Sequence, residues 1–534
     1  MEFDYIVIGA GSAGCVVASR LSEDPGVSVC LIEAGGPDSS VLTRAPLGFV
    51  AEAQLKKNSV HYQTMPQPGL NGRRGFQPRG RVLGGSSSVN AMVYCRGHRS
   101  DYDHWAELGN PGWDWASVLP LFKKAEDSTC FGANDWHGVG GPLGVDWLRS
   151  GLATTEAFLQ ACEQAGVPRT PDYNGAQQDG CWPAQVTQRG GERCSAAKAF
   201  LTPHLSRPNL KVVTQAVAAR VLLDGRRATG IAYHHGGQLR QVRARCETVL
   251  CGGAFGSPQL LLLSGIGPQA ELQRHGIAVA HALPGVGQNL QDHIDYVQTW
   301  RVPSHTETFG ASLRGAAKVA AAMLEWRRQR TGMITSPFAT AGAFVRSTPD
   351  APVPDLQLVF VLGIVDNHAR KLHLGHGISC HVEVLRPFSR GSVGLNGTDP
   401  RQAPRIDPQF LSDERDLALL LRGAQLQQRI LESSPFDGIR GPMLYPTRLD
   451  DPAGMATDIR RRADTQYHPV GTCRMGPASD PMAVVDAQLR VHGIAGLRVA
   501  DASIMPTLIG GNTNAPTVMI AEKASDLIRA RAPL

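Results

Sequence analysis

The sequence lacks several features that would place it in common protein classes. It has no run of about 18 consecutive apolar residues, the length that a membrane-spanning helix needs. Its eleven cysteines include no C-x-x-C pair, so we expect reduced thiols in a reducing compartment and no metal site. The 53 basic and 47 acidic residues are scattered and give a formal charge of only +6, which argues against a nucleic-acid partner.

Two further absences bear on location and chemistry. The N-terminus carries Glu2 and Asp4 and has no cationic segment, so we expect no cleaved signal and a cytoplasmic protein. No G-x-S-x-G sequence is present, which argues against an α/β hydrolase. With 534 residues, the chain is long enough for more than one core.

One segment leaves peripheral contact with an inner membrane open. The apolar run from Gly315 to Leu324 is followed by Trp326, Arg327 and Arg328. A basic-ended amphipathic helix can lie on an anionic membrane surface. The alternative is a helix that covers the substrate domain. Arginines in the last turn of such a helix interact favourably with the helix dipole. We favour the covering helix.

The start of the chain has the pattern of a dinucleotide site. Residues 4–8 form an apolar run that predicts a buried parallel strand. The sequence Gly9-x-Gly11-x-x-Gly14 follows at once. Its glycines permit a tight turn, close approach of a pyrophosphate and close helix packing. A second predicted strand, 27–32, ends at Glu33, 19 residues after Gly14, where a ribose-binding carboxylate belongs.

A glycine-serine loop follows between residues 80 and 93. Gly84 and Gly85 precede three serines, Ser86 to Ser88. Such a backbone can pass close to a flat or charged ligand and donate amides to it. Taken alone, the same composition also suits a linker. The segment before it, residues 35–80, has five prolines and predicts an extended excursion without βαβ units.

The middle of the chain predicts a different kind of sheet. Short strands are expected at 355–362, 376–385 and 391–395, with spacings typical of an antiparallel sheet. A helix over 412–431 follows. We expect it to begin at a Ser412 cap, and an earlier helix, up to Leu263, to begin at Ser257-Pro258.

Five separated motifs together resemble the glucose–methanol–choline (GMC) oxidoreductases, in order from Tyr5 to Leu527. They are the Gly80–Val93 loop, Gly253-x-x-x-Ser257-Pro258 through Gly267, Pro284–His293, Tyr467–Gly476, and Asp501–Pro506 with Gly511–Pro516. The likeness is strongest to bacterial FAD-dependent alcohol dehydrogenases and choline dehydrogenases. Gln185–Gln188 and Thr472–Gly476 look more like the branch that acts on medium-chain aliphatic alcohols.

The resemblance implies FAD as the cofactor. It places Ala218 beside the adenine, Asp501 and Ala502 near the ribityl and pyrophosphate groups, and Thr513 near the isoalloxazine. The implied cofactor residues are Gly9, Gly11, Ser12, Ala13, Gly14, Glu33, Ala34, Val82, Gly85, Asn90, Ala91, Met92, Val93, Ala218, Asp501, Ala502 and Thr513. Some members bind FAD covalently through a histidine in the glycine-serine loop. Val89 stands there in this chain, so we expect noncovalent FAD.

The family's catalytic pair falls on His468 and Asn512. A neutral imidazole, with an unperturbed pKa of about 6.5, can take a proton from an alcohol hydroxyl at neutral pH. An amide can hold the same oxygen without competing for the proton. Some members have histidine at the second position, so Asn512 leaves His468 as the one obvious base. No metal is expected.

The expected fold is α/β, with an FAD-binding Rossmann-like βαβ domain and a substrate domain built on an antiparallel sheet with covering helices. We expect the first domain to comprise residues 1–155, 205–300 and 465–534, and the second 156–204 and 301–464.

The expected reaction oxidises a primary alcohol to an aldehyde by proton abstraction and hydride transfer to flavin N5. Choline oxidation to betaine aldehyde and an oxygen-using alcohol oxidase are the alternatives. A quinone or another electron acceptor remains open as a partner.

Overall fold

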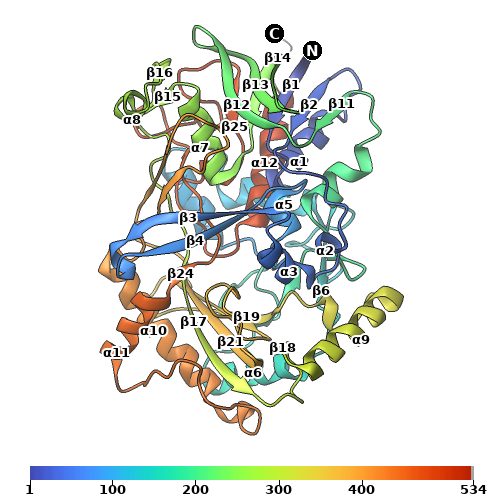
Figure 1. The fold of residues 1–534 in the computed structure, drawn as a ribbon, viewed down its shortest axis with the longest axis vertical. Helices are drawn as coiled ribbons and strands as arrows, with labels where there is room; N and C mark the ends of the chain where they lie inside the picture. Colours follow the sequence, from blue (N-terminus) through green and yellow to red (C-terminus); the bar gives the residue numbers. More distant parts are fainter. Residues whose placement is uncertain (531–534) are drawn as a thin grey trace.

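The computed structural model describes residues 1–530 and has two large sheets. Figure 1 shows the first sheet at the end of the molecule that holds both chain termini, and the second at the opposite end. A β-hairpin, β3 (Ser59–Gln67) and β4 (Arg73–Gly80), runs between them. This mixed α/β architecture confirms the expected fold class.

The first sheet combines a parallel half with an antiparallel meander. Across it, the strands are β11 (Leu210–Val213), β2 (Val29–Ile32), β1 (Glu2–Ile8), β14 (Gln238–Leu250), β13 (Arg227–His235) and β12 (Val217–Asp224), and β25 (Leu497–Val499) also pairs with β14. The pairs β11–β2, β2–β1, β1–β14 and β14–β25 are parallel. β1 and β2 are the strands predicted to flank the glycine turn.

The first and last helices lie side by side. Helix α1 (Ser12–Leu21) follows the glycine turn, and α12 (Asn514–Arg529) is the final helix. The Ser12 hydroxyl donates to Asn514 Oδ1 over 2.8 Å, and Arg20 pairs with buried Glu522 over 2.7 Å. Segments 502 residues apart therefore meet at the cofactor end of the fold.

The second sheet is antiparallel. Its strands, in order, are β24 (Asp464–Thr465), β17 (Ile294–Val302), β21 (Gly375–Val384), β20 (Leu356–Val361), β19 (Ala339–Val345) and β7 (Gly180–Pro183), with β18 (Gly310–Ala311) also pairing with β21. Helix α10 (Glu414–Leu431) packs on β17, β20 and β21, and α6 (Ala153–Gln164) packs on β7 and β19. The predicted domain limits remain a prediction.

Helix α7 begins earlier than predicted. It runs from Gly253 to Leu263, so Pro258 lies inside the helix and Ser257 does not cap it. Proline has no N–H and leaves the carbonyl four residues before it without its helical partner. That carbonyl, of Ala254, accepts a hydrogen bond of 2.6 Å from the Thr472 hydroxyl. A residue of the Tyr467–Gly476 motif therefore donates the hydrogen bond that Pro258 cannot supply within the Gly253–Gly267 motif.

Two other local predictions were wrong, and a third, for residues 35–80, was incomplete. Residues 35–80 contain α2 (Val41–Arg44), α3 (Gly48–Leu55) and the β3–β4 hairpin, so they are more than an extended excursion. Strand β22 (Ser392–Gly394) pairs with β23 (Arg405–Asp407) outside the second sheet. The side chain that caps α10 belongs to Asp413, not Ser412, because its carboxylate accepts from Arg415 N–H.

Within residues 1–530 no helix has both the length and the apolar character needed to cross a bilayer. The segment around Gly315 belongs to α9 (Leu313–Gln329), which is capped by Ser312.

Candidate active site

One cavity of about 550 Å³ brings nearly all the predicted site residues together. Its walls come from the glycine turn, the β3–β4 hairpin, the glycine-serine loop, β20 and the C-terminal segment. Of the predicted residues, all line this cavity except Gly14 and Val82. Val82 is buried and forms a β-bridge with Gly36 beside it.

The glycine turn has the geometry that its sequence predicts. Gly9 has a φ of +93°, a left-handed conformation that glycine tolerates best. A Cβ on Gly14 would lie 1.8 Å from the Gly9 carbonyl oxygen, so only glycine allows this helix packing. No atom lies within 4 Å of a Cβ position on Gly11, at the N-terminus of α1. This free space at a helix N-terminus fits a pyrophosphate.

Glu33 is buried at the end of β2. Its carboxylate accepts the N–H groups of Ala10 and Gly35, each over 2.7 Å. Burial raises the pKa of this carboxyl above its usual value, although the backbone hydrogen bonds act against that rise. A carboxylate has room for about four hydrogen bonds, so Glu33 keeps acceptor capacity for ribose hydroxyls.

The glycine-serine loop packs directly over the turn. A Cβ on Gly85 would lie 2.7 Å from Gly11 Cα. Farther along the loop, Asn90 Oδ1 accepts from Met92 N–H over 3.1 Å and from Arg193 over 2.8 Å. Burial lowers the pKa of Arg193 to about 9. The loop is therefore fixed from outside the cavity, and it presents Asn90 to Val93 to its interior.

Asp501 connects β25 to the start of α7. One of its carboxylate oxygens accepts from Gly253 N–H and the Ser257 hydroxyl, and the other accepts from Ser503. Its oxygens are thus engaged within the protein, and Ala502 and Thr513 line the cavity nearby.

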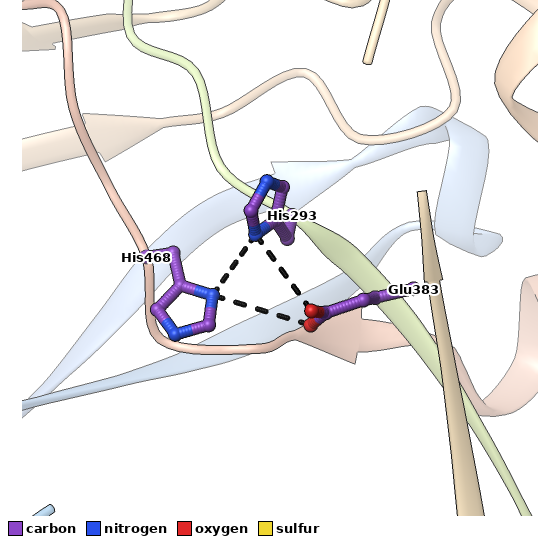
Figure 2. A group of neighbouring side chains, drawn as sticks. All are labelled: His293, Glu383 and His468. Carbon is purple, nitrogen blue, oxygen red and sulfur yellow. Dashed lines mark hydrogen bonds and ion pairs between the residues drawn. The ribbon is translucent and has the colours of Figure 1, made fainter. Parts of the chain in front are cut away.

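His468 and Asn512 meet in the wall of the cavity. His468 Nε2 lies 3.2 Å from Asn512 Nδ2. Its Nδ1 lies 2.9 Å from Nδ1 of His293, and a dashed line marks this contact in Figure 2. His293 Nε2 in turn lies 3.0 Å from the Leu385 carbonyl oxygen and 3.1 Å from that of Ile509.

These contacts set the direction of every proton in the group. Carbonyl oxygens only accept, so His293 must carry its proton on Nε2 and offer a lone pair at Nδ1. His468 must then donate from Nδ1, which leaves the lone pair on its Nε2. The contacts of Asn512 lead to the same assignment. Gln357 Nε2 lies 3.3 Å from Asn512 Oδ1, so this oxygen accepts from Gln357, and Asn512 Nδ2 is the donor to His468. The site therefore presents an unprotonated Nε2.

Burial keeps both histidines neutral. It lowers the pKa of His293 to about 4. It also lowers the pKa of His468 well below its usual value, and the electrostatic influence of the His293 ring and of Arg79 lowers it further. Asp292 fixes the backbone here, since one oxygen accepts from His468 N–H over 2.9 Å and the other from Gln77 over 2.8 Å.

Glu383 lies beside the histidine pair. Its carboxyl oxygens are 4.0 Å from Nδ1 of His293 and of His468, and neither has a hydrogen-bond partner within residues 1–530. Burial, with Asp295 and Asp292 close by, raises the pKa of Glu383 well above its usual value. The three side chains offer ligand atoms within 4.8 Å of one another, but the proton chain already uses both Nδ1 atoms. We therefore infer that His293 and Glu383 position His468 and that the three side chains do not form a metal site.

The second sheet supplies an apolar wall next to this group. Gln357, Val359 and Val361 alternate on one face of β20, and the two valines line the cavity. On β21, Glu383 pairs with Gln357 and His381 pairs with Val359. Leu362, which follows β20, is buried in the core and does not line the cavity.

The sequence reading missed several residues of this site. His293 is the last residue of the Pro284–His293 motif, so the sequence did mark this residue, but the motif suggested no role for it. Glu383 and Gln357 lie in predicted strands whose sequence gives no hint that the first lies beside the histidines and the second contacts Asn512.

Comparison with known proteins identifies the family. Residues 3–295 and 387–521 match the N-terminal and C-terminal parts of the GMC oxidoreductase family. An alcohol dehydrogenase [acceptor] of Pseudomonas putida is 43% identical, over 98% of this chain and 95% of its own. The mitochondrial choline dehydrogenase of Mus musculus is also 43% identical, over 99% of this chain and 89% of its own.

Solved structures agree as well. Pyridoxine 4-oxidase from Mesorbium loti has a TM-score of 0.89 at 32% identity, over 99% of this chain and 100% of its own. An Aspergillus oryzae formate oxidase variant, studied for FAD modification, has a TM-score of 0.91 at 28% identity, over 99% of this chain and 98% of its own. With a cavity whose turn, carboxylate and loop fit FAD, the chain belongs to the GMC oxidoreductase family of FAD-dependent oxidoreductases.

Proposed function

We propose that this protein oxidises primary alcohols to aldehydes. The observation that carries the proposal is the directed hydrogen-bond chain that leaves an unprotonated His468 Nε2 beside the Asn512 amide, at the apolar end of the cavity. The alcohol and choline dehydrogenases among its relatives support the same reaction class.

The His468–Asn512 contact matches a hydroxyl group. An alcohol oxygen entering between the two side chains can donate its proton to His468 Nε2 and accept from Asn512 Nδ2. These two hydrogen bonds to the alcohol oxygen replace the single His468–Asn512 hydrogen bond of 3.2 Å, so neither side chain is left without a partner. Holding the oxygen at two points orients the carbon that bears it. FAD held by the predicted cofactor residues would supply the hydride acceptor for that carbon.

His468 takes the hydroxyl proton. Its lone pair is available down to acidic pH because burial, His293 and Arg79 lower its pKa. The Nδ1–H bond to His293 keeps the imidazole in the tautomer that can accept at Nε2. The buried Glu383 carboxyl, with its raised pKa, adds no full negative charge next to Nδ1 while it is protonated.

We assign FAD contacts to the predicted residues that line the cavity and expect noncovalent binding. Glu33 suits the adenosine ribose, and the free space at Gly11 suits the pyrophosphate. Gly14 and Val82 contribute packing, since neither lines the cavity. Val89 lines it where a linking histidine would have to stand, and its side chain cannot form such a bond.

We propose an uncharged alcohol as substrate in preference to choline, on the ground of the carboxylates alone, because aromatic side chains such as Tyr62, Phe338 and Tyr467 also line the cavity. Recognition of a quaternary ammonium needs an aromatic cage or a carboxylate. The carboxylates that line the cavity within residues 1–530 are Glu33, Glu52 and Asp501. Glu33 and Asp501 belong to the glycine-turn and α7 regions, whereas Val359 and Val361 lie on the β20 face that also presents Gln357 to Asn512.

The test is anaerobic bleaching of the bound flavin by single substrates. Linear primary alcohols, benzyl alcohol and choline are added separately to the purified yellow protein. We expect primary alcohols to bleach it and choline to do so poorly. Rapid bleaching by choline with none by any other primary alcohol would replace this proposal with choline dehydrogenation. Subsequent addition of oxygen or a soluble quinone then identifies the class of acceptor.

A further inference from the structure

His381 lines the cavity but has no part in holding His468. Its Nδ1 lies 2.7 Å from Oδ2 of Asp295. Its Nε2 has no hydrogen-bond partner within residues 1–530. Only 8% of this residue is exposed, and the polar atoms of buried side chains are normally paired. The free nitrogen is therefore a contact that a molecule in the cavity can complete.

The sheet register places His381 beside the His468 site. On β21, His381 and Glu383 are two residues apart and therefore lie on the same face. The two positions are about 7 Å apart along the strand, and Glu383 lies 4.0 Å from Nδ1 of His468. On the neighbouring strand β20, His381 pairs with Val359, which also lines the cavity. A free histidine nitrogen thus interrupts the apolar wall, one step along the sheet from the His468 site.

Asp295 fixes the ring of His381. It lies on β17, directly opposite Glu383. Its Oδ2 contacts His381, and its Oδ1 is buried without a hydrogen-bond partner in the described part of the chain. An ionised carboxylate only accepts, so a neutral His381 donates from Nδ1 and keeps its lone pair on Nε2. Asp295 therefore makes His381 a hydrogen-bond acceptor toward the cavity.

Another cavity-lining histidine is paired with a carboxylate but offers no such contact. His368 Nδ1 lies 2.5 Å from the Tyr467 hydroxyl, and its Nε2 lies 3.1 Å from Asp464 Oδ2. Both nitrogens of His368 are thus engaged within the protein. His381 differs because one of its nitrogens stays open to a ligand.

We propose that His381 Nε2 binds a second hydroxyl of the substrate, which makes linear terminal diols the preferred alcohols. This substrate class rests on the proposed function, because both concern the same cavity. One hydroxyl enters between His468 and Asn512, the carbon chain lies along Val359, and the far hydroxyl donates to His381 Nε2. An ether oxygen has no proton to donate, so capping the far hydroxyl with a methyl group removes the contact. One such hydrogen bond is worth about two- to tenfold in affinity.

The test compares terminal diols of increasing length with their monomethyl ethers, in the FAD-loaded protein. Anaerobic stopped flow gives the limiting rate of flavin reduction and the dissociation constant for each compound. The statistical advantage of the diol, whose two ends are identical, is divided out first. We expect diols to bind about two- to tenfold more tightly than their ethers, with similar limiting rates. The preference should peak at one chain length, because the separation of His381 from His468 is fixed.

Three variants test the assignment to His381. Asp295→Leu with His381→Leu replaces both polar partners by apolar ones, so no buried charge is left unpaired. His381→Gln is the conservative variant, because its amide oxygen can accept near the position of Nε2. His376→Leu is the matched control, since it changes a buried histidine of the same strand that does not line the cavity. The double variant should bind diols and ethers alike, the glutamine variant should keep part of the preference, and the control should keep all of it.

Equal affinities for diols and ethers in the parent would overturn the proposal, as would the full preference in the double variant. If no alcohol reduces the flavin, the proposed function fails, but the same titrations still give the affinities from the change in the flavin spectrum on binding. The two failures can therefore be distinguished.

Discussion

His293→Phe should slow flavin reduction although His293 lies behind the base and not beside the alcohol. In the structure His293 Nδ1 accepts the proton of His468 Nδ1 over 2.9 Å. Phenylalanine fills a similar volume but offers no acceptor. The Nδ1–H of His468 would then be buried without a partner, so the tautomer with its proton on Nε2 becomes favoured. That tautomer cannot accept the alcohol proton.

The size of the effect follows from the lost hydrogen bond. An unpaired buried donor costs about 1–3 kcal/mol. Because each 1.4 kcal/mol is about tenfold in an equilibrium, the base-competent tautomer should fall about 5- to 150-fold, and the reduction rate with it. Since the pKa of His293 is lowered to about 4, it stays neutral across the neutral range, and the deficit there should not depend on pH.

Anaerobic stopped-flow absorbance of the flavin measures this rate directly, on protein with matched FAD content. His293→Asn is the matched control, because its side-chain oxygen lies near the position of Nδ1 and can accept from His468. We expect it to recover much of the rate. Parental rates in the phenylalanine variant would refute the argument that His293 sets the tautomer.

Three other outcomes follow from the site. The pKa of His468 is lowered well below 6.5, so the base stays neutral and the reduction rate should stay level as pH falls through 6.5; a half-loss at or above that pH would contradict this. Glu33→Gln should release FAD on dilution, seen as flavin fluorescence, while its loaded fraction reacts normally, and full retention would remove the ribose assignment. With Val89 in the loop, acid precipitation should leave the yellow colour in the supernatant, whereas a yellow pellet would indicate a covalent bond.

The sequence predicted the cofactor end of the fold well, because that end depends on local backbone geometry. Gly9, Gly14 and Gly85 hold positions where a Cβ would collide with backbone atoms. Glu33 ends a short apolar strand, which places it at a known edge of a parallel sheet. Because such positions accept only particular residue types, they can be recognised in the sequence.

The catalytic end was predicted only in part. His468 and Asn512 came from family-like motifs, but their partners come from elements that are distant in sequence. Glu383 lies beside the histidines, and Gln357 beside Asn512, only because β20 and β21 pair in one particular register. Likewise, the start of α7 before Pro258 depends on the Thr472 hydroxyl, which lies 218 residues from Ala254. Tertiary contacts of this kind override the local preference for proline in a first turn.

The central claim is that His468 Nε2 removes the alcohol proton. The most direct measurement is anaerobic stopped-flow flavin reduction by a saturating primary alcohol, in the parent and in His468→Ala, across pH. General base catalysis contributes about 10²–10⁴-fold, so the variant should lose about that much at neutral pH and recover partly as rising pH ionises the alcohol. Reduction of the His468→Ala flavin at the parental rate would contradict the mechanism.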